Sequence, residues 1–233
     1  MSIVFGIVVS WVGSGEFANY SEQYMQYNKN FFIVYILDTW NILILPLYFL
    51  LSTALELIRT GTASNPLRKI QQDMRNDGIT KKKILLTAAV STFNQVIADY
   101  GYFRALSLTS TSSGIVIFNL SSVFAYVLSL AILKEKFCFF KALSVLLAFA
   151  GAAAITFSDQ INFKPTKGAP PAWIGDVIMG SAALFWALFL VCYKKFVGEP
   201  SFGTINLQGT LVGFINTSCL WVVLVIFHYT GVE

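Results

Sequence analysis

Long apolar runs, separated by short charged stretches, are the feature of this sequence that most limits its fold. A helix that crosses a bilayer needs about 20 mostly apolar residues. Seven segments are candidates: residues 2–18, 32–56, 84–105, 109–133, 141–157, 173–193 and 204–229. Only 12% of the 233 residues are charged, whereas a soluble domain carries about 25%. The sequence therefore predicts an all-α, polytopic transmembrane helical bundle.

The placement of Lys and Arg predicts how the chain crosses the membrane. If the N-terminus is cytosolic, twelve of the sixteen Lys and Arg residues fall on the cytosolic side. Such an excess of positive charge is typical of cytosolic loops. We therefore expect a multi-pass protein with a cytosolic N-terminus, in the plasma membrane or an endomembrane. The cytosolic loop 57–83 ends in "ITKKK" and is expected to anchor the chain, with contact to a lipid headgroup as the alternative.

One linker divides the predicted bundle into two parts. Residues 158–172, "SDQINFKPTKGAPPA", form the only stretch that is rich in Pro and Gly. Five candidate spans precede it in residues 1–157, and two follow it in residues 173–233. We expect the linker to lie on the non-cytosolic side.

Amide side chains stand near the middle of four candidate spans. An unpaired amide in hydrocarbon costs several kcal/mol, so each needs a partner. Hydrogen bonds between helices explain any one of them. Four amides at a similar depth instead favour a polar cavity at the midplane, where transporters bind substrate. The candidates for lining this cavity are Asn41, Asn94, Gln95, Asn119, Ser122 and Asn216.

Asp99 and Asp38 are carboxylates inside candidate spans, where an ionisable residue is a functional hypothesis by default. Asp99 is one turn beyond Gln95, so the two share a helix face. Either Asp99 lines the cavity, or Arg104 neutralises it in a structural pair. Asp38 is one turn before Asn41 and nearer the predicted non-cytosolic interface, which favours a structural role for it.

One proline and two glycines predict how two of the spans are shaped and packed. Pro46 removes the hydrogen bond to the carbonyl of Ile42 and is expected to kink its span. Gly209 and Gly213 form a GxxxG pattern, which lets helices approach closely. We expect this close approach inside the chain, and a homodimer is left open.

The sequence lacks the residue patterns that disulfide frameworks, metal sites and ATP-binding loops require. Cys138, Cys192 and Cys219 are widely spaced and His228 is the single histidine, so we expect neither a disulfide framework nor a metal site. No GxxxxGK[ST] loop is present, so ATP is not expected to be the direct energy source. We expect no cofactor, no catalytic residue and no nucleic-acid partner. The expected partners are the lipid bilayer and a small-molecule substrate.

Several pieces of the sequence resemble one superfamily of transporters. Residues 98–159 combine an aromatic-rich span end, a small-residue start of the next span, the turn "LKEK" and a helix that ends in Gly-Ala-Ala-Ala. This stretch resembles the second half of an EamA-type repeat of the drug/metabolite transporter superfamily. The pieces "WVGSGEF" (11–17) and "TWNILILPLYFLL" (39–51) resemble the F subfamily of solute carrier family 35.

The resemblance implies ten helices in two inverted five-helix repeats, cytosolic termini and alternating access. Residues 1–157 then form one complete repeat, and residues 173–233 form two helices of a second. Because three helices of the second repeat are missing, we expect a truncated, partial gene product. Some F-subfamily members are associated with thiamine-like cations. The implied function is secondary transport of a small polar metabolite, with a thiamine-like cation as one possible substrate.

Other functions are weighed against transport. A truncated chain is compatible with a non-transporting scaffold or regulatory protein. A seven-helix receptor needs its N-terminus outside, which places twelve cations on the outer face. A nucleotide-sugar transporter needs basic residues that bind its anionic substrate, and Arg104 alone supplies little positive charge for this. A membrane-embedded enzyme lacks paired catalytic residues.

Overall fold

The computed structural model describes residues 20, 29–61, 65–109, 111–162 and 172–231. These residues form helices joined by short connections, with no strand among them, which confirms the predicted all-α fold class. The elements in chain order are α2 (Asn30–Thr39), η1 (Trp40–Leu43), α3 (Ile44–Thr60), α4 (Pro66–Asn76), α5 (Lys81–Leu106), α6 (Thr111–Asn119), α7 (Ser121–Leu128), η2 (Ser129–Leu133), α8 (Phe139–Asn162), α9 (Ala172–Val197), α10 (Phe202–Cys219) and α11 (Trp221–Thr230).

Four helical stretches in the described part of the chain are long and apolar enough to cross a membrane. They are Asn30–Arg59, Ser113–Leu133, Trp173–Val197 and Phe202–Thr230. They correspond to four of the seven predicted spans, and the predicted span 2–18 lies outside the described residues.

The predicted spans 84–105 and 141–157 are helical and correspond to α5 and α8. α5 carries buried polar residues, among them Thr87, Ser91 and Thr92, on the face that packs inside the protein. In α8, the stretch Phe139–Gly151 is apolar.

The chain forms two compact units, and the division falls inside α5 and α9. Unit 1 comprises Met1–Asn30 and Ile97–Val191, and unit 2 comprises Phe31–Val96 and Cys192–Glu233. Each unit therefore combines segments that are distant in the sequence. The division of the chain into repeats at the 158–172 linker stays a prediction.

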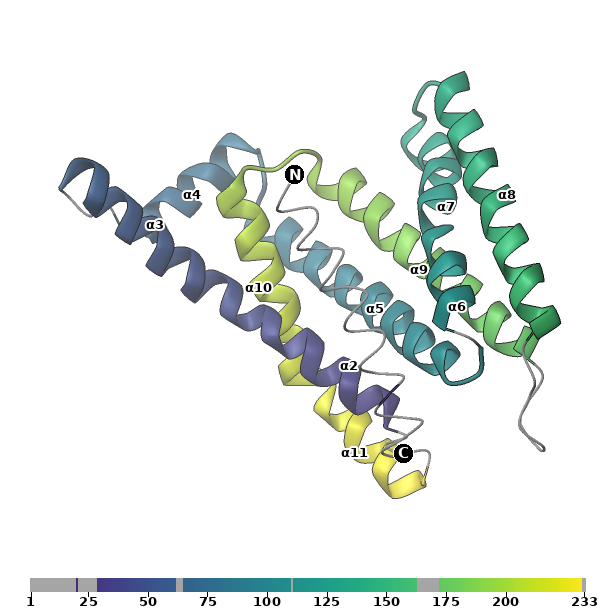
Figure 1. The fold of residues 1–233 in the computed structure, drawn as a ribbon. Helices are drawn as coiled ribbons and strands as arrows, with labels where there is room; N and C mark the ends of the chain where they lie inside the picture. The colour runs from purple at the N-terminus through teal and green to yellow at the C-terminus, as the bar shows by residue number, and fades with distance from the viewer. Residues whose placement is uncertain (1–19, 21–28, 62–64, 110, 163–171, 232–233) are drawn as a thin grey trace. The chain divides into compact units, whose positions relative to one another are not determined.

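In unit 1, α8 packs beside α6 and α7 (Figure 1). The hydroxyl of Tyr126 in α7 joins the start of α8, because it donates to the carbonyl of Cys138 at 3.1 Å and accepts from its N–H at 3.2 Å. The ring of Phe118 in α6 lies edge-on to that of Tyr102 in α5, with centroids 4.8 Å apart. These contacts hold α6 and α7 against their neighbours on both sides.

In unit 2, α10 packs along η1, α3 and α4 (Figure 1). Gly213 faces η1 so closely that a Cβ atom there would lie 2.7 Å from the carbonyl carbon of Asn41. A Cβ atom at Gly209 would lie 2.8 Å from Cδ1 of Ile44. The expectation that the GxxxG pattern packs inside the chain is therefore confirmed.

The short 3₁₀ turn η1 interrupts the first described span just before Pro46. The N–H of Ile44 bonds to the carbonyl of Asn41, as 3₁₀ geometry requires. The N–H of Leu45 instead donates to the hydroxyl of Thr210 in α10, at 2.9 Å. The neighbouring helix thus satisfies a donor that the interruption leaves without its helical partner.

Local signals in the sequence fix the ends of the amphipathic helix α4. The Asn65 side chain caps its start by accepting from the N–H of Leu67 at 3.1 Å, and Pro66 follows the cap. Gly78, with φ +64°, terminates the helix in the left-handed conformation that glycine adopts without strain. Of this helix, Ile70 is buried, and its polar residues lie on the opposite side.

Candidate functional site

A buried carboxylate and an amide meet inside unit 2. Asp38 in α2 is 4% exposed, and its Oδ1 accepts a hydrogen bond of 2.8 Å from Nε2 of Gln95 in α5. The other oxygen, Oδ2, is buried and has no hydrogen-bond partner among the described residues. Because a buried polar atom without a partner is costly, an orphaned oxygen of this kind marks a place where a ligand or water fits.

A second orphaned acceptor lies on α10. Asn216 is fully buried, and its Nδ2 donates to the carbonyl of Tyr35 at 3.0 Å and to the hydroxyl of Thr39 at 3.3 Å. Its Oδ1 has no partner in the described part of the chain. Thr39 follows Asp38 directly, so the two orphaned acceptors belong to adjoining parts of one polar cluster. We refer to Asp38, Thr39, Gln95 and Asn216 as the buried polar cluster.

Two further predicted residues lie in unit 2 with this cluster. Asn41 is half-buried in η1, where its backbone meets Gly213, three residues before Asn216. Asn94 is also half-buried, but its amide donates to the carbonyl of Val90 in its own helix, at 2.9 Å. Four predicted residues thus come together around one helix crossing, whereas Asn94 is engaged locally.

The remaining predicted residues lie in unit 1. Asp99 and Arg104 are partly buried in the second half of α5. Asn119 ends α6, Ser122 lies in the first turn of α7, and both are exposed. Whether these residues line a substrate path stays a prediction.

Some polar residues of the two units were not singled out from the sequence. Gln208 in α10 is buried, and its amide can bond to the backbone of α5 at Ile84 and Ala88. In unit 1 the hydroxyl of Thr109 donates to Oδ1 of Asp176 at 2.7 Å. Asp176 stands near the start of a predicted span, where an ionisable residue is itself a functional signal.

The two orphaned oxygens of the buried polar cluster can each accept a hydrogen bond. An ionised carboxylate and an amide oxygen are both acceptors. Oδ1 of Asp38 accepts from Gln95, and Nδ2 of Asn216 donates to Thr39. The two orphaned oxygens are the polar atoms of Asp38 and Asn216 that are left without a partner in the described part of the chain. Among the described residues, no group of three or more His, Cys, Asp and Glu side chains could hold a metal ion.

Comparison with known proteins identifies the family of this chain. The model of the EamA-like transporter family matches residues 31–157, which is more than half of the sequence. The chain belongs to the EamA-like transporter family. Together with the four apolar helices, this membership makes it a multi-pass integral membrane protein.

Individual relatives of this EamA-like chain are solute carriers. Solute carrier family 35 member F4 of Homo sapiens is 26% identical over 99% of this chain and 42% of its own length. Member F3 of Homo sapiens is 23% identical over 100% of this chain and 53% of its own length. The predicted resemblance to the F subfamily is therefore confirmed.

The EamA-like chain spans about half the length of the curated relatives named here and of their Mus musculus counterparts. No solved structure matches it. The buried polar cluster lies within the part of the sequence that the relatives share, because the alignments with members F3 and F4 cover almost the whole chain.

Proposed function

We propose that this chain acts in secondary transport of a small polar metabolite that carries a positive charge, such as a thiamine-like cation. The observation that supports the proposal is the orphaned Oδ2 of Asp38, a buried carboxylate oxygen inside a membrane-length helix. Ionisable residues at such positions mark substrate and ion pathways in membrane proteins.

The chemistry of the cluster favours a cation over an anion. The two orphaned atoms, Oδ2 of Asp38 and Oδ1 of Asn216, are both hydrogen-bond acceptors. A substrate with N–H donors and a positive charge supplies the kind of group that these atoms lack. An anionic substrate such as a nucleotide sugar adds a further acceptor and repels Asp38.

Alternating access is the mechanism that we propose for this transport. Gly213 brings α10 against η1 near the cluster, and η1 is an interruption in the first described span. Broken helices at a binding site are typical of secondary transporters. In this scheme η1 and α10 bind the substrate between them and change their packing as the site opens to each side.

Uptake by proteoliposomes that contain the purified chain tests this function. A labelled thiamine-like cation is the probe, and the variant is Asp38→Asn, which keeps the shape of the side chain and removes its charge. We expect uptake to fall at least about tenfold, which corresponds to about 1.4 kcal/mol of lost interaction.

Glu199→Gln is the matched control, because Glu199 is exposed in the loop between α9 and α10. It should leave uptake unchanged. Asp99→Asn tests the second predicted carboxylate in the same assay. If wild-type vesicles take up no more cation than empty ones, the scaffold function becomes the better account. If Asp38→Asn transports like the wild type, Asp38 has no part in transport.

A further inference from the structure

A cavity of about 790 Å³ lies within unit 2, between α3, α4 and the start of α10. Its wall is apolar and includes Leu47, Leu51 and Leu55, which follow one another at helical spacing along α3. The rings of Tyr48 and Phe202 also line it and lie edge to face, with centroids 5.7 Å apart. A cavity of this volume holds a molecule of drug size.

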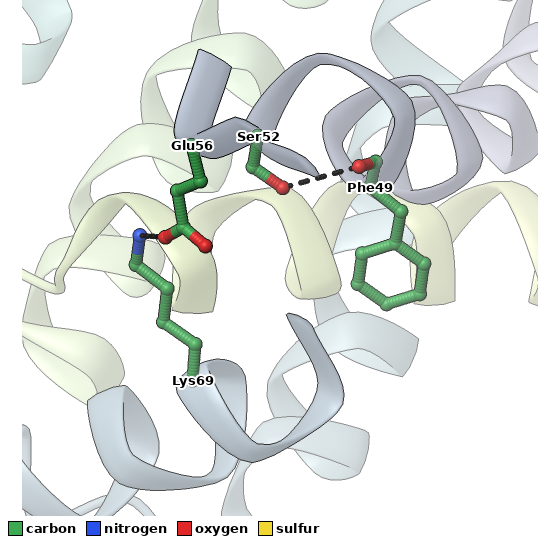
Figure 2. Close-up of polar contacts among 4 residues, drawn as sticks. All are labelled: Phe49, Ser52, Glu56 and Lys69. Atoms are coloured by element: carbon green, nitrogen blue, oxygen red, sulfur yellow. Dashed lines mark hydrogen bonds and ion pairs between the residues drawn. The ribbon is translucent and has the colours of Figure 1, made fainter. Parts of the chain in front are cut away.

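One end of this cavity is charged. Figure 2 shows Glu56 of α3 and Lys69 of α4 facing each other, with Nζ and Oε1 3.0 Å apart. Arg59 and Asp73 line the same end. The rim therefore has two positive and two negative side chains beside an apolar wall.

Lys69 and Glu56 form an ion pair at this end. The guanidinium of Arg59 and the carboxylate of Asp73 make no recorded ion pair or hydrogen bond there. Asp73 lies against Gly203, where a side chain would collide with its carboxylate. Among the described residues, Arg59 and Asp73 are thus the two unpaired groups at the charged end, although the hydrogen bond of Glu56 raises the pKa of Lys69 and the charge of Asp73 adds to this.

The charged end lies where two membrane-length stretches end and begin. α3 belongs to a membrane-length stretch that ends at Arg59, and α10 begins another at Phe202. α4 connects α3 to α5 and is amphipathic, with Ile70 buried beneath a basic outer face. A helix of this kind lies in the plane of the interface. The apolar wall therefore extends from the headgroup level into the hydrocarbon.

We propose that this cavity binds one phospholipid whose headgroup carries both a phosphate and a primary amine. The phosphate pairs with Arg59, the ammonium pairs with Asp73, and an acyl chain lies along Leu47, Leu51 and Leu55. This placement satisfies both unpaired charges at once and leaves the Lys69–Glu56 pair intact.

Other common headgroups fit this pair of charges less well. A phosphatidylglycerol headgroup has no cation for Asp73. A phosphatidylcholine headgroup has a positive charge but no N–H to donate to the carboxylate. Phosphatidylethanolamine has both groups, and its amine donates hydrogen bonds as well as charge.

Native mass spectrometry of the purified full chain tests the proposal directly. The protein is offered phosphatidylethanolamine, phosphatidylcholine and phosphatidylglycerol with identical acyl chains. We expect phosphatidylethanolamine to be retained about fivefold more than either of the others, the size of one favourable ion pair at a part-exposed site. Equal retention of the three lipids overturns the proposal.

Variants of the two unpaired residues, Arg59 and Asp73, test the contacts of the phosphate and of the amine separately. Asp73→Asn should remove the preference for phosphatidylethanolamine over phosphatidylglycerol, and Arg59→Gln should weaken the retention of all three lipids. Arg59→Lys should restore retention. Arg68→Gln is the matched control, since it removes a charge from the same surface but does not line the cavity. If it acts like Arg59→Gln, the effect belongs to the basic surface and the specific site is refuted.

A wild-type measurement keeps the proposal testable if a variant fails to fold. A photoactivatable phosphatidylethanolamine should crosslink within residues 44–59, 69–73 and 202–206, and crosslinks confined to other segments contradict the site. Excess soluble glycerophosphoethanolamine should not prevent this crosslinking, because it lacks the acyl chain. If it competes as well as the lipid does, the cavity is a site for a soluble solute instead.

Discussion

At the scale of single residues, hydrogen bonds to the Asp77 side chain join the loop after α4 to the start of α10. Its Oδ2 accepts hydrogen bonds from the hydroxyl of Thr204 at 2.6 Å, and from the hydroxyl and N–H of Ser201 at 2.7 and 3.0 Å. The Thr204 hydrogen bond is the main cause that lowers the pKa of Asp77 below 3.8, with the Ser201 bonds adding to it and desolvation opposing it.

The variant Asp77→Asn tests whether these hydrogen bonds stabilise the fold, through the pH dependence of stability. Because the folded pKa is lowered, the ionised form stabilises the fold above pH 3.8, and this contribution is lost as the pH falls through the lowered pKa. We expect the variant to lose about 1 kcal/mol at neutral pH, since a hydrogen bond to a charged acceptor is replaced by a neutral one. Thermal unfolding in detergent at pH 7 and pH 3 measures both values.

The difference between Asp77→Asn and the wild type should shrink at pH 3. Glu199→Gln is the control, because Glu199 is exposed near the same loop. A difference that is the same at both pH values means that ionised Asp77 is not what stabilises the start of α10.

Several polar residues at the helix crossing were singled out from the sequence, but how they pair was not predicted. Gln95 and Asn216 were expected at mid-depth, and they contact the residues around Asp38. Asp38 itself was expected to have a structural role, yet the structure leaves one of its oxygens buried without a partner. The pairing depends on how each helix is rotated about its axis, and a pattern within one helix does not contain that information.

At the scale of helices, the close contact of α10 with η1 depends on one glycine. Gly213→Ala places a Cβ atom against the backbone of Asn41 and Ile42. We expect this overpacking to cost about 1–3 kcal/mol of stability. Thermal unfolding of the purified protein, followed by size-exclusion chromatography, measures the loss.

Gly151→Ala in α8 is the matched control for this prediction. A Cβ atom at Gly151 meets no atom within 4 Å, and alanine favours the helix by up to about 1 kcal/mol over glycine. The control should be neutral or stabilising. If both variants unfold at the same temperature, α10 does not approach η1 in the way described.

The positions of the helices could be predicted better than their environment. Apolar runs predicted α5 and α8 at about the right residues, because hydropathy and helix-end signals are local. That α5 packs polar side chains such as Thr87 and Ser91 inside the protein could not be predicted, since burial depends on which helices surround it.

At the scale of the whole molecule, the family of transporters could be predicted from the sequence, whereas the two compact units could not. Unit 2 joins residues 31–96 to residues 192–233, which lie on opposite sides of the linker at 158–172. Local composition marks a linker, but it does not determine which segments pack together across it. The buried polar cluster depends on this long-range packing, because Asp38 and Asn216 come from its two parts.

The most direct test of the central claim is whether solute and water reach the buried polar cluster. We propose Thr39→Cys in a chain whose native residues Cys138, Cys192 and Cys219 have been replaced, labelled with a membrane-impermeant thiol reagent. Phe214→Cys, on an exposed apolar position of α10, is the lipid-facing control, and Glu199→Cys is the reactive one. The account predicts that Thr39→Cys is labelled and that a thiamine-like cation slows this labelling. If Thr39→Cys stays unlabelled while Glu199→Cys reacts fully, the cluster is sealed and the proposed substrate site is contradicted.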